Sequence, residues 1–555
     1  MQRQCRITDE SFEVSNQELE FLKRVSPSFA GQNFQVPPPT VAPEERQRTR
    51  LAFRNLRNLY KRTCDLSGKA ILSMYDPKLP GTVYETSLYW SDRWDALQYG
   101  VEFDFNRPFF EQFASLLVHV PRIHHYVILS ENCDYINGAA NCRNCYLSFN
   151  MDYCEDCYYL HNSTHTRSSL DSSGVSQCEL CYECVDCDTC YELLYSQHCS
   201  GCSESYFLSS CQRCNNCIGC SNLVGKQYYI FNKSTTKEEF QALRSELRSS
   251  LKRDEFWAKS DEQQLLFPKK YYYGHSNESF SGNGLRHVRN AYDCYDSYEL
   301  ENCWHCNYVF QAKNCMDYNI FGDHSEWIYQ CLATGINCSS DLFCVGIWNG
   351  SSNNIYCMTL SASSNCFGCC GLTHKQYCIL NKQYSAQAYE ALVAKIIEHM
   401  QRTREWGEFF PPALSPFPFN QTIGWEEYPL NREEALRRGY NWQDFDQKEG
   451  GVNEIPLPDA IDDVLDSVVS QTLYCEDTSL PYKIIPQELK LYRTLGIPLP
   501  RISPQARHMR RMRRRLPRKL WRRVCEKCHR QLESPYSPQY VGKIYCDNCY
   551  AADVF

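Results

Sequence analysis

The sequence predicts a mainly β protein with some α-helix, in which two cysteine-rich, β-solenoid-like repeats are flanked by two duplicated zinc-ribbon-like modules. Three observations lead to this prediction. Residues 36–89 align without a gap with residues 497–550. The stretch NCIGCSNLVGKQYYIFNK (216–233) recurs as NCFGCCGLTHKQYCILNK (365–382). Within the first repeat the cysteines recur with a period of twelve, as at Cys142 and Cys154, and such fixed-period repetition is typical of stacked-repeat folds.

The composition limits the class of protein. With 555 residues the chain is long enough for several domains, and 43% hydrophobic and 14% aromatic residues suffice for folded cores. We find no secretory signal at the start and no apolar run that would span a bilayer. We therefore expect a cytoplasmic protein without membrane contact, in which clustered cysteines act more often as metal ligands than as disulfides.

The C-terminal module carries the strongest metal signal. Two C-x-x-C pairs, at 525–528 and 546–549, flank a short predicted hairpin. Each pair directs two thiolates toward one point, and two pairs complete a tetrahedron around zinc. We therefore predict a structural zinc site formed by Cys525, Cys528, Cys546 and Cys549.

The N-terminal module keeps the hairpin but loses the ligands. Cys64 matches Cys525, whereas Ser67, Glu85 and Leu88 stand at the positions of the other three ligands. Because a single thiolate does not hold zinc, we expect this degenerate copy to fold without metal.

A basic segment precedes each predicted hairpin. Residues 46–62 contain seven Lys or Arg, residues 507–523 contain ten, and neither segment contains an acid. Spacings of three and four residues place these cations on one helical face, although Pro517 would interrupt the second helix. Such a row of cations suits a phosphate backbone; the alternatives are a solvated face and a face docked on the acidic body of the protein. The predicted nucleic-acid ligands are Arg46, Arg50, Arg54, Arg57, Lys61, Arg507, Arg511, Arg515, Arg518 and Arg522.

The middle of the chain is predicted to form the two solenoids. A 12-residue unit rich in Cys, Tyr, Asn and Ser, with little helical periodicity, suits one narrow coil. Six cysteines of the first repeat share one phase of this period: Cys142, Cys154, Cys178, Cys190, Cys202 and Cys214. In the second repeat the period drifts to thirteen, at Cys331, Cys344, Cys357 and Cys370.

Stacked coils bring equivalent cysteines together. Coils about 4.8 Å apart form ladders of side chains, and thiolates around one zinc lie about 3.8 Å apart. A C-x-x-C corner could therefore share a metal with the corner above it. The alternatives are a core of small buried thiols, and disulfides if the protein is exported. The predicted solenoid ligands are Cys142, Cys145, Cys154, Cys157, Cys187, Cys190, Cys199 and Cys202.

Each solenoid is predicted to end in a capping helix. Thr235 and Glu238 form a candidate capping box ahead of one apolar stripe, and a second stripe follows residue 382. A proline-rich and acidic connector then leads to the basic segment and zinc ribbon. The predicted domains are residues 1–110, 111–257, 258–406, 407–480 and 481–555.

The chain resembles a group of known sequences. LYKRTCDLSGKAILSMY, WSDRWD, KQYxIxNK, IPLPR and the final C-x-x-C pairs resemble cysteine-rich hypothetical proteins of uncultured, small-genome bacteria. This resemblance covers most of the chain and implies no activity. It implies C-P-x-C in relatives where this chain has Ala42/Glu45 and Ser503/Ala506. The C-terminal module alone is similar to zinc-ribbon and treble-clef domains.

These observations predict a zinc-binding scaffold that binds nucleic acid, RNA rather than DNA, through its two basic modules. The alternatives are a structural or assembly protein whose solenoids self-associate, and a thiol or metal store. No nucleophile–base pattern and no phosphate-binding glycine loop stand out, so we expect neither an enzyme nor a small-molecule substrate.

Overall fold

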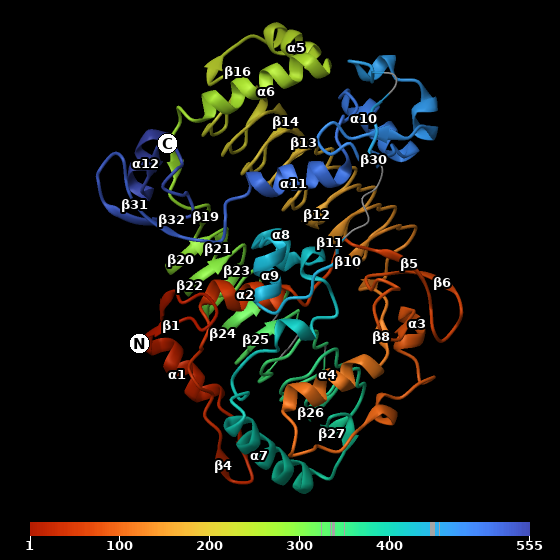
Figure 1. Ribbon diagram of the computed structural model, residues 1–555. Coiled ribbons are helices and arrows are strands. Elements are labelled where there is room, and N and C mark those ends of the chain that lie inside the picture. The colour runs from red at the N-terminus through yellow and green to blue at the C-terminus, as the bar shows by residue number, and fades with distance from the viewer. Residues whose placement is uncertain are drawn as a thin grey trace. The chain divides into compact units, whose positions relative to one another are not determined.

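The computed structural model describes residues 1–322, 325–333, 335, 339–348, 350–444, 450–453 and 456–554 (Figure 1). The chain divides into two compact units, neither of which is continuous in sequence. Unit 1 consists of residues 1–125 and 272–444, and unit 2 of residues 126–271 and 445–555. Each unit thus combines one end module with the cysteine-rich repeat that lies farther from it along the chain.

The first cysteine-rich repeat is a β-solenoid in unit 2, as predicted. Its strands pair in parallel with a 12-residue shift, as in Asn137↔Phe149 and Phe149↔His161. Between β12 and β13 the same register continues through isolated bridges such as Arg167↔Glu179. The strands are β9 (Val127–Ile128), β10 (Asn137–Ala140), β11 (Phe149–Asp152), β12 (His161–Thr164), β13 (Tyr191–Leu194), β14 (Ser203–Tyr206), β15 (Asn215–Ile218) and β16 (Gln227–Ile230).

A left-handed residue at every third position shapes the coil. Asn141 and Asn144 have φ of 53° and 54°, and the pattern recurs along the solenoid. Asn tolerates this conformation better than most residues because its short side chain can bond locally. Each such residue turns the chain, so four tripeptides complete one 12-residue coil. The residue after each turn lies inside, as do the buried Cys142 and Cys145.

Each coil points four side chains into a narrow interior. Because interiors are close-packed, small residues fill much of this space. The Sγ of Cys157 lies 3.2 Å from the carbonyl oxygen of Glu155 and 3.3 Å from that of Thr166. The hydroxyl of Ser148 donates in the same way to the carbonyl of Tyr146, at 3.0 Å. Cys and Ser therefore make equivalent contacts at interior positions.

The second repeat forms another solenoid, in unit 1. Its first coils have an 11-residue register, as in Glu278↔Arg289, and the register becomes 12 from Gly282↔Cys294 onward. It is 13 from Ala312↔Ser325 to Val345↔Met358 and returns to 12 at Ser352↔Ser364. The cysteine spacing of thirteen coincides with this register at Cys331, Cys344 and Cys357. It does not at Cys370, because Cys369 stacks on Cys357, with its N–H 3.4 Å from the Cys357 Sγ. The strands are β19 (Gly274–His275), β20 (Glu278–Asn283), β21 (Leu285–Arg286), β22 (Arg289–Tyr295), β23 (Tyr298–Trp304), β24 (Phe310–Asn319), β25 (Tyr329–Leu332), β26 (Ser364–Phe367) and β27 (Gln376–Ile379).

A helix follows each solenoid, as predicted, and a short antiparallel strand that was not predicted precedes it. After the first come β17 (Lys233–Ser234), α5 (Lys237–Glu246) and α6 (Ser250–Gln264); after the second come β28 (Lys382–Gln383) and α7 (Ala386–Arg402). The capping box of α5 is formed by Thr236 and Glu239, one residue beyond the predicted pair. Phe240 on α5 is buried against the ring of Tyr228 in the last coil.

The two end modules have matching elements. Those of unit 1 are β5 (Tyr60–Thr63), β6 (Ala70–Ser73), β7 (Val83–Tyr84) and α3 (Thr86–Tyr89). Those of unit 2 are β31 (Trp521–Val524), β32 (Gln531–Ser534), β33 (Ile544–Tyr545) and α12 (Asp547–Val554). Upstream, β1 (Gln2–Gln4), β2 (Ser11–Glu13) and α1 (Asn16–Val25) have counterparts in β29 (Leu473–Tyr474), β30 (Pro481–Tyr482) and α10 (Pro486–Leu495). In each module one strand pairs in parallel with a distant segment: β7 with β8 (Arg122–Ile123), and β33 with β18 (Lys269–Lys270).

The basic segments are helical over a shorter stretch than predicted. Helix α2 spans Pro43–Leu51 and α11 spans Pro504–Arg514, so α11 ends before Pro517, as expected. Only the first two predicted cations of each module lie on these helices, and the prediction of one helical face for all five is wrong. Among the described residues, no helix combines the length and the hydrophobicity that crossing a bilayer requires.

Candidate metal centre

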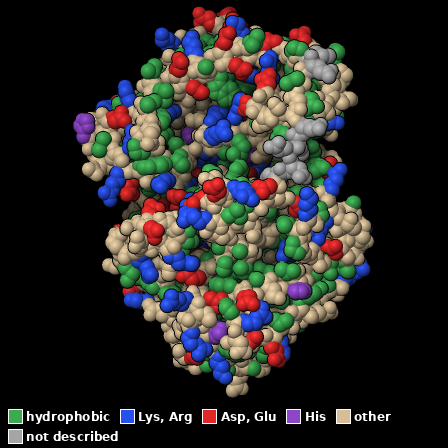
Figure 2. All heavy atoms as spheres, viewed as in Figure 1, with side chains coloured by type: hydrophobic (Ala, Val, Ile, Leu, Met, Phe, Trp, Pro, Cys, Tyr) green, Lys and Arg blue, Asp and Glu red, His purple; other side chains and the backbone are tan. Residues whose placement is uncertain are grey.

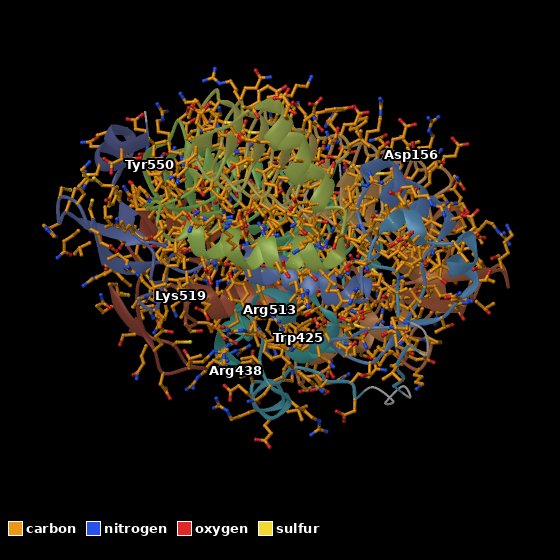
Figure 3. The ribbon with its side chains drawn as sticks, turned by 90° about the horizontal axis from the view of Figure 1, so that it is seen from above. Asp156, Trp425, Arg438, Arg513, Lys519 and Tyr550 are labelled. Atoms are coloured by element: carbon orange, nitrogen blue, oxygen red, sulfur yellow. The ribbon has the colours of Figure 1, made fainter. Side chains whose placement is uncertain are left out.

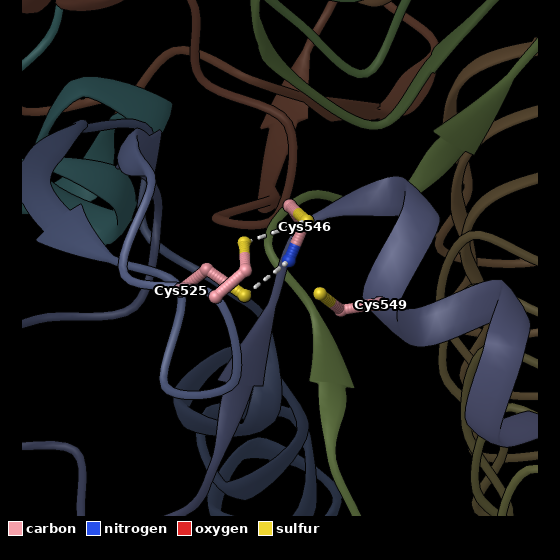
Figure 4. Close-up of side chains that lie close together, drawn as sticks. Cys525, Cys546 and Cys549 are labelled. Atoms are coloured by element: carbon pink, nitrogen blue, oxygen red, sulfur yellow. Dashed lines mark hydrogen bonds between the residues drawn. The ribbon is translucent and has the colours of Figure 1, made fainter.

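The four C-terminal cysteines come together at one point. Their Sγ atoms all lie within 4.8 Å of one another, and those of Cys528 and Cys546 are 3.7 Å apart. Thiolates arranged tetrahedrally around zinc lie about 3.8 Å apart, so the set fits a single zinc ion. Figure 4 shows the side chains of Cys525, Cys546 and Cys549 directed toward one another.

Two local structures place these ligands. The first pair lies on a tight turn: the Cys525 N–H donates to the carbonyl of Arg530 and the His529 N–H to the carbonyl of Cys525, both at 2.8 Å. His529 has a left-handed φ of 60°, which closes this turn. The second pair lies at the start of α12, where free backbone N–H groups favour negative charge.

The environment favours the thiolate form at Cys525. Its side chain is fully buried, and burial alone would raise its pKa. Backbone N–H groups of Cys546 and Cys528 outweigh this effect and lower the pKa of Cys525 to about 6. The N–H of Cys546 lies 3.3 Å from the Cys525 sulfur. A thiolate ligand is therefore available near neutral pH.

The N-terminal copy has the same turn without the ligand set. The N–H of Cys64 donates to the carbonyl of Lys69 at 2.8 Å, and the Gly68 N–H donates to the carbonyl of Cys64 at 2.9 Å. The Cys64 sulfur accepts from the N–H groups of Ser67 and Glu85, both at 3.4 Å. The Cys525 sulfur accepts the equivalent bond from the N–H of Cys546, so these hydrogen bonds belong to the turn in both copies. A metal-free N-terminal copy stays a prediction.

The eight solenoid cysteines predicted as ligands lie inside the coils. In the described part of the chain, the C-terminal set is the one group of three or more Cys, His, Asp or Glu ligand atoms that gathers within 4.8 Å. The solenoid sulfurs instead contact backbone carbonyls, as at Cys142, 3.1 Å from the oxygen of Ala140. Every described cysteine is free of disulfides. Metal binding by Cys142, Cys145, Cys154, Cys157, Cys187, Cys190, Cys199 and Cys202 stays a prediction.

Four of the ten predicted nucleic-acid ligands are buried. Arg46, Arg50, Arg507 and Arg511 have relative exposures of 4%, 0%, 1% and 0%. Guanidinium groups so deeply buried cannot reach a phosphate backbone, so the prediction is wrong for these residues. The alternative of a face docked on the acidic body of the protein holds for them instead.

In unit 1, Arg46 and Arg50 share one buried carboxylate of the second solenoid. The Nε of Arg46 lies 2.7 Å from Asp317 Oδ2, and Nη2 of Arg50 lies 3.1 Å from Oδ1. Burial alone would raise the pKa of Asp317, but the two guanidinium groups keep it below its ordinary value. Asp317 has a left-handed φ of 56° and so occupies a corner of its coil.

Unit 2 repeats this arrangement with the first solenoid. The Nε of Arg507 lies 2.8 Å from Asp171 Oδ2, and Nη1 of Arg511 lies 3.0 Å from Oδ1. Nη1 of Arg511 also contacts Glu183 at 2.9 Å, and Arg507 contacts Glu488 of α10 at 3.4 Å. We call each such group, a helix with two buried arginines bound to one corner aspartate, an arginine clamp. It fixes an end module to a solenoid.

The other predicted cations lie outside the clamps. Arg57 lies 3.6 Å from Glu426, and Arg515 lies 3.6 Å from Asp186. Arg54 and Arg518 are half-buried, and Lys61 and Arg522 are exposed. Arg513 and Lys519, labelled in Figure 3, are also exposed. On the face drawn in Figure 2, Lys and Arg are interspersed with Asp and Glu.

Reasoning from the sequence missed the acidic half of each clamp. Asp171, Glu183 and Asp317 look like ordinary polar residues of the repeat, because their corner position appears only once the three-residue period is recognised. That period was available as a signal: the cysteines of 133–220 all fall on every third position.

Comparisons with known proteins do not place the chain in a family. No model of a protein family matches it, and no curated protein matches it. One solved structure, titled a putative acetyltransferase from Desulfovibrio desulfuricans G20, matches at 10% identity and a TM-score of 0.09. The match covers 42% of this chain and 64% of that one, and a TM-score this low defines no shared fold.

Proposed function

We propose that this protein is a structural scaffold in which two solenoids are held by end modules, one of which is stabilised by zinc. The four converging thiols of the C-terminal set carry the proposal. Four sulfur ligands at these separations suit tetrahedral zinc better than metals that prefer oxygen or square-planar geometry. The module would then be of the zinc-ribbon type.

The pattern of burial supports a structural role. Cys, Ser and Leu fill the solenoid interiors, and the guanidinium groups of the arginine clamps contact buried carboxylates of the same unit. Stacked repeats present long regular surfaces, and such surfaces serve to space and assemble other components. Self-association of the solenoids is one form that assembly could take.

Metal analysis of the purified full-length chain tests the zinc part. We expect about one zinc per chain, lost in Cys546→Ser/Cys549→Ser. Cys64→Ser is the matched control, since it removes the equivalent thiol of the copy without a ligand set, and it should retain the metal. Metal-free wild-type protein, or equal loss in the control, would reject this part.

Retention on heparin, a polyanion that stands in for nucleic acid, tests the scaffold part. Retention that collapses with salt, and that is lost in Arg513→Ala/Lys519→Ala/Arg522→Ala, would favour the nucleic-acid function instead. We expect no such retention. Zinc binding and the scaffold role can thus fail separately.

A further inference from the structure

The first coil of the solenoid in unit 2 has an unpaired backbone edge. In later coils, corner N–H groups donate to carbonyls of the coil before, as the N–H of Asn144 does to Glu131 at 3.1 Å. The equivalent groups of the first coil are the N–H groups of Leu129, Asn132 and Tyr135. No coil precedes them, and among the described residues they have no other hydrogen-bond acceptor. We call this edge the open coil.

The other end of the same solenoid is covered. There β17 pairs antiparallel with β16 through Tyr229↔Ser234, and α5 packs Phe240 against the ring of Tyr228. Among the described strands, β9 in the first coil pairs with β10 alone and so forms the outer edge of its sheet. An exposed sheet edge is a template for pairing with another strand, which is why proteins usually cover it. The solenoid is therefore closed at its C-terminal end and open at its N-terminal end.

The interior of the solenoid is also less covered at the open coil. Cys133, at an interior position of the first coil, is only partly buried, whereas Cys142 and Cys145 of the second coil are buried. Ile128 and Leu129 are 45% and 83% exposed. An extended strand that paired with the open coil would therefore satisfy its backbone groups and shield apolar side chains at the same time.

The charges at the open coil restrict which strand can pair with it. Glu131 and Asp134 are both exposed. Glu131 begins a column of side chains in which acids and bases alternate from coil to coil, since Glu155 contacts Arg143 of the coil before and Arg167 of the coil after. A strand that continues the stack should therefore carry a cation opposite Glu131. Two open coils would instead bring acids together, and like charges that face each other are destabilising.

Strand β31 of the C-terminal module is a cationic strand with a free edge. Among the described strands it pairs with β32 alone. The N–H of Cys525, directly after β31, donates to the carbonyl of Arg530 at 2.8 Å, in the register of the β31–β32 pair. Because hydrogen-bonded and non-bonded pairs alternate in an antiparallel ladder, the backbone groups of Arg522 and Val524 point away from β32. Both of these residues are exposed.

The two free edges complement each other. The carbonyls of Tyr126 and Ile128 accept N–H groups of the second coil, at 3.0 and 3.1 Å. Val127 and Leu129 alternate with them, so their backbone groups face the open side. One residue of β31 can bond both with its own N–H and C=O, and a long cationic side chain of β31 then reaches Glu131.

We propose that the open coil binds strand β31 of a second copy of the chain and so joins copies head to tail. The inference rests on the proposed scaffold function and names the partner of its assembly. Figure 1 shows β31 well apart from β10, which neighbours β9 in the same unit. Each copy in such a pair keeps one unused surface of the opposite kind, so the contact repeats and builds rings or filaments.

Sedimentation velocity of the full-length chain over a range of concentrations tests the contact. We expect the mean mass of wild type to rise with concentration above the 64.9 kDa of one chain. Glu131→Arg/Asp134→Arg should raise the dissociation constant at least about tenfold, because cations then face cations. Glu246→Arg/Glu262→Arg is the matched control: it makes the same change of charge at exposed positions of α5 and α6, and it should associate as wild type does.

A mixing experiment tests whether the two surfaces meet. Arg522→Glu should weaken self-association as Glu131→Arg/Asp134→Arg does. An equal mixture of the two variants should again form dimers, because the intact β31 of the second variant meets the intact open coil of the first. Every substituted residue is exposed, and circular dichroism together with the zinc content verifies that each variant folds.

Four results would overturn the proposal. Wild type could stay monomeric at every concentration, Glu131→Arg/Asp134→Arg could associate as wild type does, or the control could lose association equally. Association that stops at a dimer and persists in Arg522→Glu would assign the open coil to a second open coil instead. Monomeric protein that holds zinc and is not retained on heparin would reject this inference alone, whereas salt-sensitive retention on heparin bears on the scaffold function.

Discussion

Replacement of Arg511 by methionine tests the arginine clamp of unit 2. The guanidinium group is fully buried and contacts Asp171 at 3.0 Å and Glu183 at 2.9 Å. Methionine keeps most of the apolar volume but removes the charge. Asp171 and Glu183 would then stay buried with only part of their negative charge neutralised.

The structure sets the expected size of the effect. Removing one partner of a buried ion pair costs about 3–5 kcal/mol, because the remaining charge is left uncompensated. Arg507 still contacts Asp171 at 2.8 Å, so we expect the lower part of this range, about 3 kcal/mol, for Arg511→Met. Arg513, two residues further on, is exposed, and Arg513→Met should change stability by less than about 0.5 kcal/mol.

Urea unfolding of the full-length chain, followed by circular dichroism, measures both variants. Arg511→Met should lower the midpoint of the transition that belongs to unit 2, and high salt should not reproduce the effect, since a buried pair is poorly screened. If Arg511→Met is no more destabilising than Arg513→Met, the clamp does not stabilise the fold and the reasoning fails.

Three further predictions concern single residues. Burial raises the pKa of Asp341 to about 7, so the folded state keeps a proton that the unfolded state releases near pH 4. The stability of the folded state should therefore fall as pH rises from about 4 to 7. Thermal unfolding across this range should show the fall in wild type and not in Asp341→Asn. Burial would lower the pKa of His305, but Asp293 and Glu18, 2.7 and 3.0 Å away, raise it to about 10. The contribution of His305 to stability should be complete below about pH 6.5 and disappear as pH rises toward 10. A wild-type stability profile identical to that of His305→Gln would contradict this. Ser168 turns its coil with φ of 46°, so Ser168→Val should be about 1–2 kcal/mol less stable than Ser168→Gly in urea, and equal stability would show that the corner conformation is unstrained.

The sequence allowed the repeats to be predicted because their chemistry is periodic. Cysteines with a period of twelve indicated the coil. The drift to a spacing of thirteen at Cys331, Cys344 and Cys357 coincides with 13-residue coils in the second solenoid, which the sequence analysis did not predict. The same reasoning failed at Cys370, since an adjacent cysteine can mimic a register that the backbone does not keep. The gathering of the four C-terminal cysteines could be predicted from their spacing alone, because two C-x-x-C turns leave little freedom in where the sulfur atoms lie.

The role of the arginines could not be predicted in the same way. A row of cations looks the same in sequence whether it faces solvent, phosphate or a buried aspartate. The deciding partners, Asp171 and Asp317, are 340 and 271 residues away from Arg511 and Arg46, respectively, and each belongs to the solenoid farther from its own module. Long-range pairing of this kind depends on the fold and leaves no local pattern.

Hydrogen exchange on two matched variants tests most directly whether each end module stabilises the distant solenoid. Arg50→Met should accelerate exchange in the coils around Asp317, residues 289–332, and leave residues 137–230 at wild-type rates. Arg511→Met should do the reverse. Equal effects of either variant on both solenoids, or an effect on the solenoid nearer in sequence, would contradict the assignment of modules to units.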